Sequence, residues 1–223
     1  MGKLMIKSII FDLDGTLANT IEDITDGLNG MLNELGFPTV TVAQTLENIN
    51  NGALELVRRS LPEDKRDDGF ARYAKTVYEK YYAKCYNCKT YAYEGVTEAL
   101  KELALQGITL CVLSNKQDPF VKEIVKKLFA YVPFAYVCGQ SDRFPTKPDP
   151  TSVNYIMSKL GISPDECAFV GDSGVDIKTA KNASLHPVGV SWGYRSVDVL
   201  NDEGAALIIN NTDSLSEIPN LLI

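Results

Sequence analysis

One stretch decides how this chain folds: Phe11-Asp12-Leu13-Asp14-Gly15-Thr16-Leu17. It ends a short run rich in isoleucine, residues 6–11, which predicts a buried strand. Asp12 and Asp14 stand two positions apart, so an extended chain places both side chains on one side, and Gly15 then permits a turn that other residues resist. Two like charges held this close repel by about 1 kcal/mol in water and by several times more in a drier site. We therefore expect a cation that neutralises the pair, or one acid that holds a proton.

The chain is acidic, with 223 residues and a net charge of -7. This length supports one sizeable core, or one core with a small accessory lobe. The acidic balance argues against nucleic acid and anionic membranes as partners, although a local cation can still attract an anionic substrate. No apolar stretch is long enough to span a bilayer, and residues 1–5 lack the apolar region of an export signal. We expect a cytoplasmic protein.

Five cysteines are scattered along the chain: Cys85, Cys88, Cys111, Cys138 and Cys167. An odd number without an export signal predicts reduced thiols. The last three lie in apolar, strand-like runs and are expected to fill the core. Cys85 and Cys88 have C-x-x-C spacing, but there is no second pair and only one histidine in the chain, so they cannot complete a structural zinc site. We interpret them as incidental thiols near a helix end.

Residues 19–90 show helical patterns and no strand pattern. Thr20 is a plausible N-cap for a helix whose apolar residues recur every three or four positions as far as Leu35. Thr41 can cap a second helix, and further helices are expected at 53–60 and within 64–88. We interpret 19–90 as an all-helical cap domain, inserted after the first strand.

From residue 91 onward strands and helices alternate. Apolar strands are expected at 108–113, 134–138, 166–170, 187–190 and 206–209, with helices at 94–106, 119–129, 151–160 and 174–182. Apolar strands that alternate with helices predict a parallel sheet covered on both faces. The expected fold class is therefore α/β, a three-layer α/β/α Rossmann-like sheet formed by residues 1–18 and 91–223.

Polar residues follow the predicted strands at their carboxyl ends, where open α/β sheets bind ligands. The first strand delivers Asp12 and Asp14, and the second delivers the run 114–116, Ser-Asn-Lys. A later strand delivers the run 171–176, and Lys147 lies between them in a proline-rich loop just before a helix. Each signal is weak alone, but four of them occur in order at predicted strand ends.

Together these segments resemble the four motifs of the haloacid dehalogenase superfamily of phosphohydrolases. The motifs are Asp12-Leu13-Asp14-Gly15-Thr16, Ser114-Asn115, Lys147-Pro148, and Gly171-Asp172-Ser173 with Asp176. Within the superfamily the chain looks most like the phosphoglycolate phosphatase branch, which carries a helical cap of the C1 type between its first two motifs. Residues 147–150 and 188–193 are also typical of that branch. Ser184 departs from it, because the family usually has a glycine there. We expect this to alter a turn and not the chemistry.

The resemblance implies a role for each motif residue. Asp12 would be the nucleophile that forms an aspartyl-phosphate, and Asp14 would protonate the leaving oxygen and later deprotonate water. Lys147 would supply a fixed positive charge for the phosphoryl group. Ser114 and Asn115 would donate hydrogen bonds to its oxygens.

A second set of residues is implied to hold a divalent cation. Asp12, the carbonyl of Asp14 and Asp172 would bind Mg²⁺, which prefers a few carboxylates together with phosphate oxygen and water. Asp176 and Ser173 would support this site, and Asp176 would anchor metal-bound waters or Lys147. A plain carboxylate at a helix start is the alternative for Asp176. Thr16 would orient Asp14 or the phosphate-binding loop.

The expected function is a Mg²⁺-dependent phosphatase of small phosphate monoesters, similar to phosphoglycolate phosphatase and acting as a monomer or homodimer. A pyrophosphatase, a nucleotidase, or a sugar-phosphate phosphatase or phosphomutase of the same superfamily is the alternative. A non-catalytic binding protein is less well supported, because the motif acids and Lys147 are intact. The sugar phosphomutases usually carry a histidine soon after the first motif, and this chain does not.

The cap would choose the leaving group. Asn19, Asn51, Gly52 and Arg58 are candidates for substrate specificity, because the polar loop and the arginine could meet a second anion on the substrate. For Arg58, a solvated position on a helix surface is the alternative.

Overall fold

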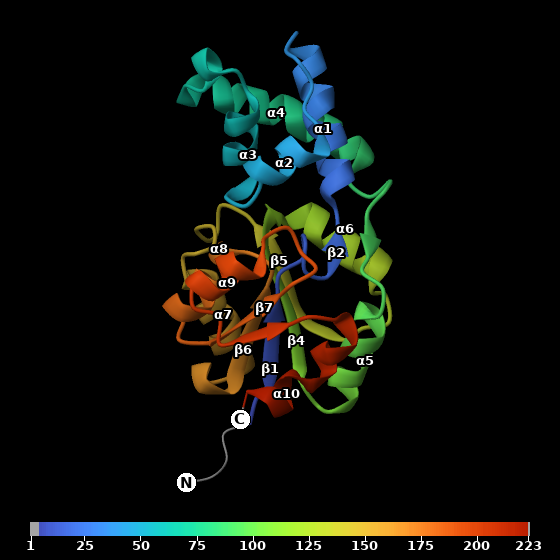
Figure 1. Cartoon of the computed structure of the whole chain (residues 1–223), viewed down its shortest axis with the longest axis vertical. Coiled ribbons are helices and arrows are strands. Elements are labelled where there is room, and N and C mark those ends of the chain that lie inside the picture. The colour runs from blue at the N-terminus through green and yellow to red at the C-terminus, as the bar shows by residue number, and fades with distance from the viewer. Residues whose placement is uncertain (1–4, 223) are drawn as a thin grey trace. The chain divides into compact units, whose positions relative to one another are not determined.

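The computed structural model describes residues 5–222, so most of the segment searched for an export signal lies outside the described residues. The chain forms two compact units (Figure 1). The core unit comprises residues 1–18 and 92–223, and the helical unit comprises residues 19–91. The chain passes between the two units in two short strands that pair with each other, β2 (Ala18–Asn19) and β3 (Tyr91–Ala92). We did not predict these strands, since two residues are too few to show an alternating pattern.

A parallel sheet of six strands forms the centre of the core unit. The strands are β1 (Ser8–Phe11), β4 (Thr109–Gln117), β5 (Phe134–Gln140), β6 (Cys167–Gly171), β7 (His186–Val190) and β8 (Leu207–Ile209). Their spatial order is β5-β4-β1-β6-β7-β8, so β1 lies between β4 and β6. The connections reverse direction at β1, and this reversal opens the crevice in which doubly wound sheets bind ligands. The predicted Rossmann-like α/β fold is confirmed.

Helices flank this sheet (Figure 1). They are α5 (Val96–Leu105), α6 (Asp118–Leu128), α7 (Thr151–Leu160), α8 (Gly174–Asn182), α9 (Val197–Asp202) and α10 (Ile218–Leu221), with 3-10 turns η2 (Pro164–Glu166) and η3 (Thr212–Glu217). Residues of α7 and α8 pack in one cluster with Ile10, Cys111 and Phe169 of the sheet. The predicted burial of Cys111, Cys138 and Cys167 is confirmed, and all five cysteines are free thiols.

Ser184 lies between α8 and β7, with a φ of 59°. This is the left-handed region, which glycine adopts without strain and serine adopts rarely. Ser184 therefore holds, at the turn before β7, a backbone conformation that favours glycine.

The helical unit consists of α1 (Ile21–Glu34), α2 (Val42–Asn48), α3 (Gly52–Ser60), the 3-10 turn η1 (Glu63–Lys65) and α4 (Asp68–Cys85). Helices α1 and α4 pack closely because two glycines of α1 face tyrosines of α4. A Cβ at Gly30 would lie 2.9 Å from the Cβ of Tyr81, and one at Gly27 would lie 3.1 Å from the ring of Tyr78. The tyrosines of α4 therefore serve largely as packing. Among the described residues, no helix combines the length and apolar character needed to cross a membrane.

Of the two N-caps predicted from the sequence, Thr41 and Thr20, only Thr41 forms a side-chain cap bond. Thr41 caps α2 as predicted, because its hydroxyl accepts a hydrogen bond from Gln44 N at 3.2 Å. Thr20 occupies the N-cap position of α1 but makes no side-chain cap bond; the Ile21 N–H donates instead to the Asn19 side chain at 3.2 Å. In the same first turn the fully buried Asp23 accepts hydrogen bonds from the backbone N–H groups of residues 89 and 90 and from the Thr90 hydroxyl, at 2.7–3.1 Å. This carboxylate joins the start of α1 to the segment that follows α4.

Candidate active site

The motif residues of the core unit meet at the carboxyl ends of β1, β4 and β6. Phe11, the last residue of β1, pairs with Val112 of β4 and with Val170 of β6. Because the three strands are parallel and in register, the residues that follow them arrive at one edge of the sheet. Asp12 follows β1 and Asp172 follows β6.

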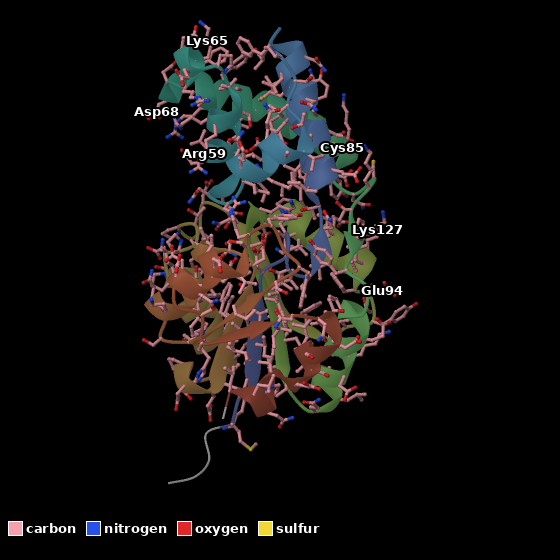
Figure 2. All side chains as sticks on the ribbon, viewed as in Figure 1. Arg59, Lys65, Asp68, Cys85, Glu94 and Lys127 are labelled. Atoms are coloured by element: carbon pink, nitrogen blue, oxygen red, sulfur yellow. The ribbon has the colours of Figure 1, made fainter. Side chains whose placement is uncertain are left out.

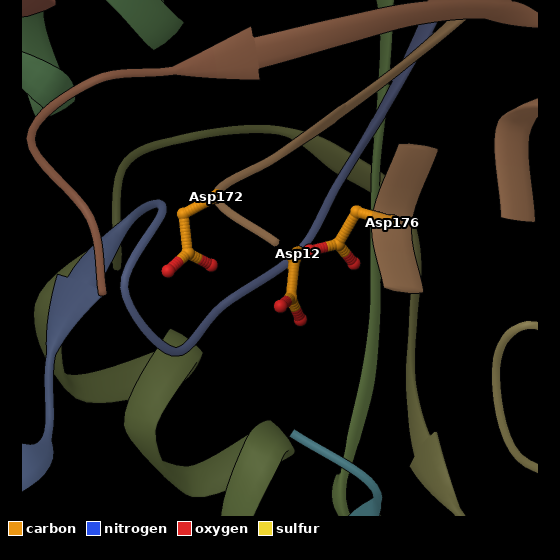
Figure 3. A group of neighbouring side chains, drawn as sticks. All are labelled: Asp12, Asp172 and Asp176. Atoms are coloured by element: carbon orange, nitrogen blue, oxygen red, sulfur yellow. The ribbon is translucent and has the colours of Figure 1, made fainter. Parts of the chain in front are cut away.

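Three buried carboxylates, Asp12, Asp172 and Asp176, lie together at this edge (Figure 3). Each offers one oxygen, and these oxygens all lie within 4.8 Å of one another. Burial raises the pKa of Asp12 to about 7, with the neighbouring carboxylates adding to the shift and Lys147 opposing it. Burial, together with Asp176 and Asp12, also raises the pKa of Asp172 well above its usual value. The raised pKa values show that Lys147 offsets only part of the cost of placing these negative charges together in a buried site.

Lys147 supplies part of that compensation. Its Nζ lies 2.6 Å from Asp176 Oδ1 and 3.0 Å from Asp12 Oδ1, and the residue is 4% exposed. Burial alone would lower the pKa of Lys147, but the attraction of the two carboxylates outweighs it, so the pKa is raised and the side chain stays charged. The lysine is a fixed ammonium group beside the predicted nucleophile.

Asn115 holds the backbone of Lys147 in place. Its Oδ1 accepts from Lys147 N at 2.8 Å, and its Nδ2 donates to Lys147 O at 3.0 Å. In the structure this amide contacts the loop of Lys147, and its hydrogen bond to a phosphoryl oxygen stays a prediction. Ser114 is buried, and its Oγ accepts from Lys116 N at 3.2 Å.

Asp176 combines both interpretations considered from the sequence. It lies in the first turn of α8, where its Oδ2 accepts from the backbone N and the hydroxyl of Ser173 at 3.1 and 2.7 Å. Its Oδ1 accepts from Lys147. The same carboxylate therefore caps a helix and orients the lysine.

Two glycines pack against Asp172, the third carboxylate. A Cβ at Gly193 would lie 2.7 Å from Asp172 Cγ and 2.6 Å from the carbonyl oxygen of Gly15, and a Cβ at Gly15 would lie 2.7 Å from Asp172 Cγ. The Tyr194 N–H donates to Asp172 Oδ2 at 2.6 Å, and the Thr16 hydroxyl lies 3.4 Å from Oδ1. Contacts from two loops therefore fix the direction of this carboxylate.

The loop after β7 was recognised in the sequence only as typical of the family branch. Besides Gly193 and Tyr194 it contributes Trp192, whose indole N–H donates to Thr16 O at 3.1 Å. The signal that could have found it is a glycine at a strand end, where close backbone approach is common. Which group this glycine would approach could not be predicted, because Asp172 lies on a different strand end.

Asp14 pairs with a different lysine. Lys116, near the end of β4, places its Nζ 2.8 Å from Asp14 Oδ1, and the two side chains are 6% and 15% exposed. We expected one cation or one proton to relieve the repulsion of the two aspartates. In the structure each aspartate has its own ammonium partner, Lys147 for Asp12 and Lys116 for Asp14. The motif pattern implied no role for Lys116.

The carboxylate cluster fits a hard divalent cation. Three buried carboxylates face one ammonium group, so a cation would complete the compensation of charge. Carboxylate oxygens are ligands that Mg²⁺ accepts, together with waters and a phosphate oxygen. The side-chain cluster contains Asp176 in addition to the predicted Asp12 and Asp172, while the carboxylate of Asp14 is engaged with Lys116.

The four specificity candidates belong to the helical unit, and Asn19 is its first residue. Arg58 pairs with Glu55 at 3.1 Å and with Asp68, labelled in Figure 2, at 2.8 Å. Arg58 is thus paired within the helical unit, and its role toward the substrate stays a prediction. Asn51 accepts from Arg59 at 2.9 Å, Gly52 has a φ of 81°, and Asn19 donates to the Tyr91 hydroxyl at 3.1 Å.

Comparisons with known proteins agree with this geometry. The sequence profile of the haloacid dehalogenase-like hydrolases matches residues 9–190. A phosphoglycolate phosphatase of Pseudomonas putida is 31% identical over 213 residues, covering 94% of this chain and 78% of the relative. One from Vibrio vulnificus is 35% identical over 200 residues, 87% of each chain. The crystal structure of a predicted phosphoglycolate phosphatase from Haemophilus somnus superposes with a TM-score of 0.86 at 27% identity, over 97% of this chain and 99% of that one.

The resemblance found in the motifs is thus confirmed along most of the chain, and the protein belongs to the haloacid dehalogenase-like hydrolase family.

Proposed function

We propose that this hydrolase is a Mg²⁺-dependent phosphatase that cleaves small phosphate monoesters through an aspartyl-phosphate, with phosphoglycolate or a similar compound as substrate. Its family membership and its similarity to phosphoglycolate phosphatases make the chain a phosphatase. The observation that carries the mechanism is Lys147, buried between Asp12 and Asp176 beside Asp172.

In the first step an oxygen of Asp12 forms a bond to phosphorus. The bond between phosphorus and the leaving oxygen breaks, and the electron pair remains on that oxygen. Asp14, two residues later on the same loop, donates the proton that the leaving alcohol needs. Lys147 offsets the charge of the nucleophile and of the phosphoryl group in a site that is largely screened from solvent.

In the second step water attacks the phosphorus of the aspartyl-phosphate. Asp14 takes the proton of that water, the acyl-phosphate bond breaks, and Asp12 returns to its starting carboxylate. Asp12 and Asp172 would hold Mg²⁺, with Asp176 nearby. The cation supplies Lewis-acid stabilisation of the phosphoryl oxygens.

Asn115 and Ser173 act through their neighbours in this scheme. Asn115 fixes the backbone of Lys147, and Ser173 orients Asp176. We propose that the helical unit, residues 19–91, is the cap that selects the leaving group, as caps and lids of this kind exclude water from a reaction.

The test measures phosphate released from 2-phosphoglycolate, pyrophosphate, a nucleoside monophosphate and a sugar phosphate, with Mg²⁺ or with EDTA. We expect Mg²⁺-dependent turnover that is fastest on 2-phosphoglycolate. Asp12→Asn should lose turnover and should form no acid-stable phosphoenzyme. Asp198→Asn, which changes an exposed aspartate of α9, should match the wild type. Turnover that persists in Asp12→Asn would rule out the mechanism, and faster turnover of another ester would replace the substrate.

A further inference from the structure

We propose that Lys116 is a positioning residue of the phosphatase reaction. Its ammonium group holds the carboxyl of Asp14 and stabilises the negative charge that forms there when the proton moves to the leaving oxygen. This inference rests on the proposed function, in which Asp14 is the proton donor. It concerns a residue outside the motif positions that carry the family resemblance.

The contact between the two side chains is direct. Lys116 Nζ lies 2.8 Å from Asp14 Oδ1, with 6% of the lysine side chain and 15% of the aspartate side chain exposed. A charged pair that is this close and this poorly solvated interacts more strongly than an exposed pair does. The pair therefore limits the orientation of the Asp14 carboxyl.

The backbone of Lys116 is itself fixed. It lies in β4, and its N–H donates to Ser114 Oγ at 3.2 Å. Gly139 of β5 packs tightly against the same segment: a Cβ there would lie 2.8 Å from Asp118 N, and closer still to the Lys116 carbonyl oxygen. The Gly139 N–H also donates to Asp118 Oδ1 at 3.0 Å. The ammonium group thus extends from a rigid strand end.

The charge change on Asp14 gives this ammonium group a task. In the proposed reaction Asp14 gives its proton to the leaving oxygen while the bond from phosphorus to that oxygen breaks, so negative charge develops on a carboxyl that Lys116 contacts directly. A fixed positive charge beside the developing carboxylate lowers the energy of the transition state without reorganisation. The carboxylate is then in the form that removes a proton from water in the second step.

The two lysines of the site have separate tasks. Lys147 contacts Asp12 and Asp176, and it acts on the nucleophile and the phosphoryl group. Lys116 contacts Asp14, so its influence depends on whether the leaving group needs a proton. A comparison of two leaving groups therefore separates this role from a structural one, because a structural change would affect both substrates equally.

The experiment compares Lys116→Met and Lys116→Gln with the wild type on two substrates. 2-Phosphoglycolate has an alkoxide leaving group that needs a proton, and p-nitrophenyl phosphate has a weakly basic leaving group that does not. The value of kcat/KM reports the steps up to departure of the leaving group. We expect it to fall roughly 10- to 100-fold for 2-phosphoglycolate, part of the effect typical of acid catalysis, and less than about 3-fold for p-nitrophenyl phosphate.

Two further variants complete the design. Lys116→Arg keeps the charge and should restore most of the activity on 2-phosphoglycolate. Lys122→Met removes an exposed lysine of α6 that pairs with Asp118, and should leave both substrates unchanged. Thermal unfolding of each variant identifies any that do not fold, and Lys116→Gln keeps a polar group if the methionine variant is unstable.

The outcomes separate the two proposals. An equal loss on both substrates would show that Lys116 is merely structural, and no loss on either would show that it is dispensable. Either result overturns this inference while the phosphatase stands. A wild type that hydrolyses neither ester with Mg²⁺ would remove the proposed function, and this inference with it.

Discussion

Gly193→Ala tests whether the loop after β7 fixes the carboxylate of Asp172. A Cβ at position 193 would lie 2.6 Å from the carbonyl oxygen of Gly15 and 2.7 Å from Asp172 Cγ. Both distances are shorter than nonbonded contacts to a Cβ, and one of the neighbours is backbone. The obstacle is space, because the positive-φ glycines of the described chain do not include Gly193. The methyl group must therefore displace the 193–194 segment, the loop of Gly15, or Asp172.

The size of the effect follows from these contacts. Extra methyl groups in a packed site cost about 1–3 kcal/mol, and a domain of this length loses roughly 2–4 °C in Tm per kcal/mol. We expect Gly193→Ala to lower Tm by about 2–12 °C. The displacement also disturbs the hydrogen bond from Tyr194 N to Asp172 Oδ2. Because changes to groups that orient a metal ligand typically weaken metal binding roughly 10- to 100-fold, the Mg²⁺ midpoint should rise by that factor.

The assay is thermal unfolding at increasing Mg²⁺, followed by a Mg²⁺ titration of phosphate release. Gly69→Ala is the matched control: Gly69 is exposed in the first turn of α4, and its added Cβ would meet only the side-chain oxygen of Asp67, at 3.3 Å. Alanine is the better helix former, so this control should keep or raise Tm. If Gly193→Ala unfolds at the wild-type temperature with an unchanged Mg²⁺ midpoint, the loop does not position Asp172.

Three further predictions concern buried charge and thiols. Burial raises the pKa of Asp172, so the folded state resists a carboxylate that the unfolded chain carries above about pH 4. Without Mg²⁺, the free energy of unfolding of Asp172→Asn should therefore rise relative to that of the wild type between about pH 4 and pH 7.5, as denaturant titrations would show. Mg²⁺ should stabilise only the wild type. A stability difference that does not depend on pH would contradict this prediction. Burial raises the pKa of the Cys111 thiol to about 12, whereas Cys88 is exposed. A disulfide reagent should accordingly label Cys88 rapidly and Cys111 only after denaturation, as mass spectrometry of the labelled peptides would show. Asp23→Asn replaces one acceptor oxygen of a buried carboxylate, which accepts several hydrogen bonds, by a donor group. The free energy of unfolding should fall by about 1–3 kcal/mol in a denaturant titration. An unchanged midpoint would mean that the hydrogen bonds from residues 89 and 90 to Asp23 contribute nothing to stability.

Local sequence patterns were enough to predict the kind of fold and the sheet edge at which the core motif residues lie. Apolar strands that alternate with helices can bury both faces only in a parallel sheet, and the structure has that sheet, with β1 at its centre. A carboxylate directly after a strand must lie at the sheet's carboxyl edge, so Asp12 and Asp172 were placed from local pattern alone. The capping box of Thr41 was likewise local, because its partner lies three residues away.

The contacts between these groups, in contrast, depend on how distant parts of the chain come together in the folded protein. Asp14 pairs with Lys116, and Gly193 and Tyr194 pack against Asp172. These contacts join residues that are 21 to 102 positions apart in the chain. No periodicity encodes such contacts, because they depend on strand order and on the register between neighbouring strands. For the same reason the hydrogen bonds of Asn115 to the Lys147 backbone appear only in the folded chain, while its contact with a phosphoryl oxygen stays a prediction. A strand pattern fixes which edge a side chain reaches, and the order of the strands fixes which partner it meets there.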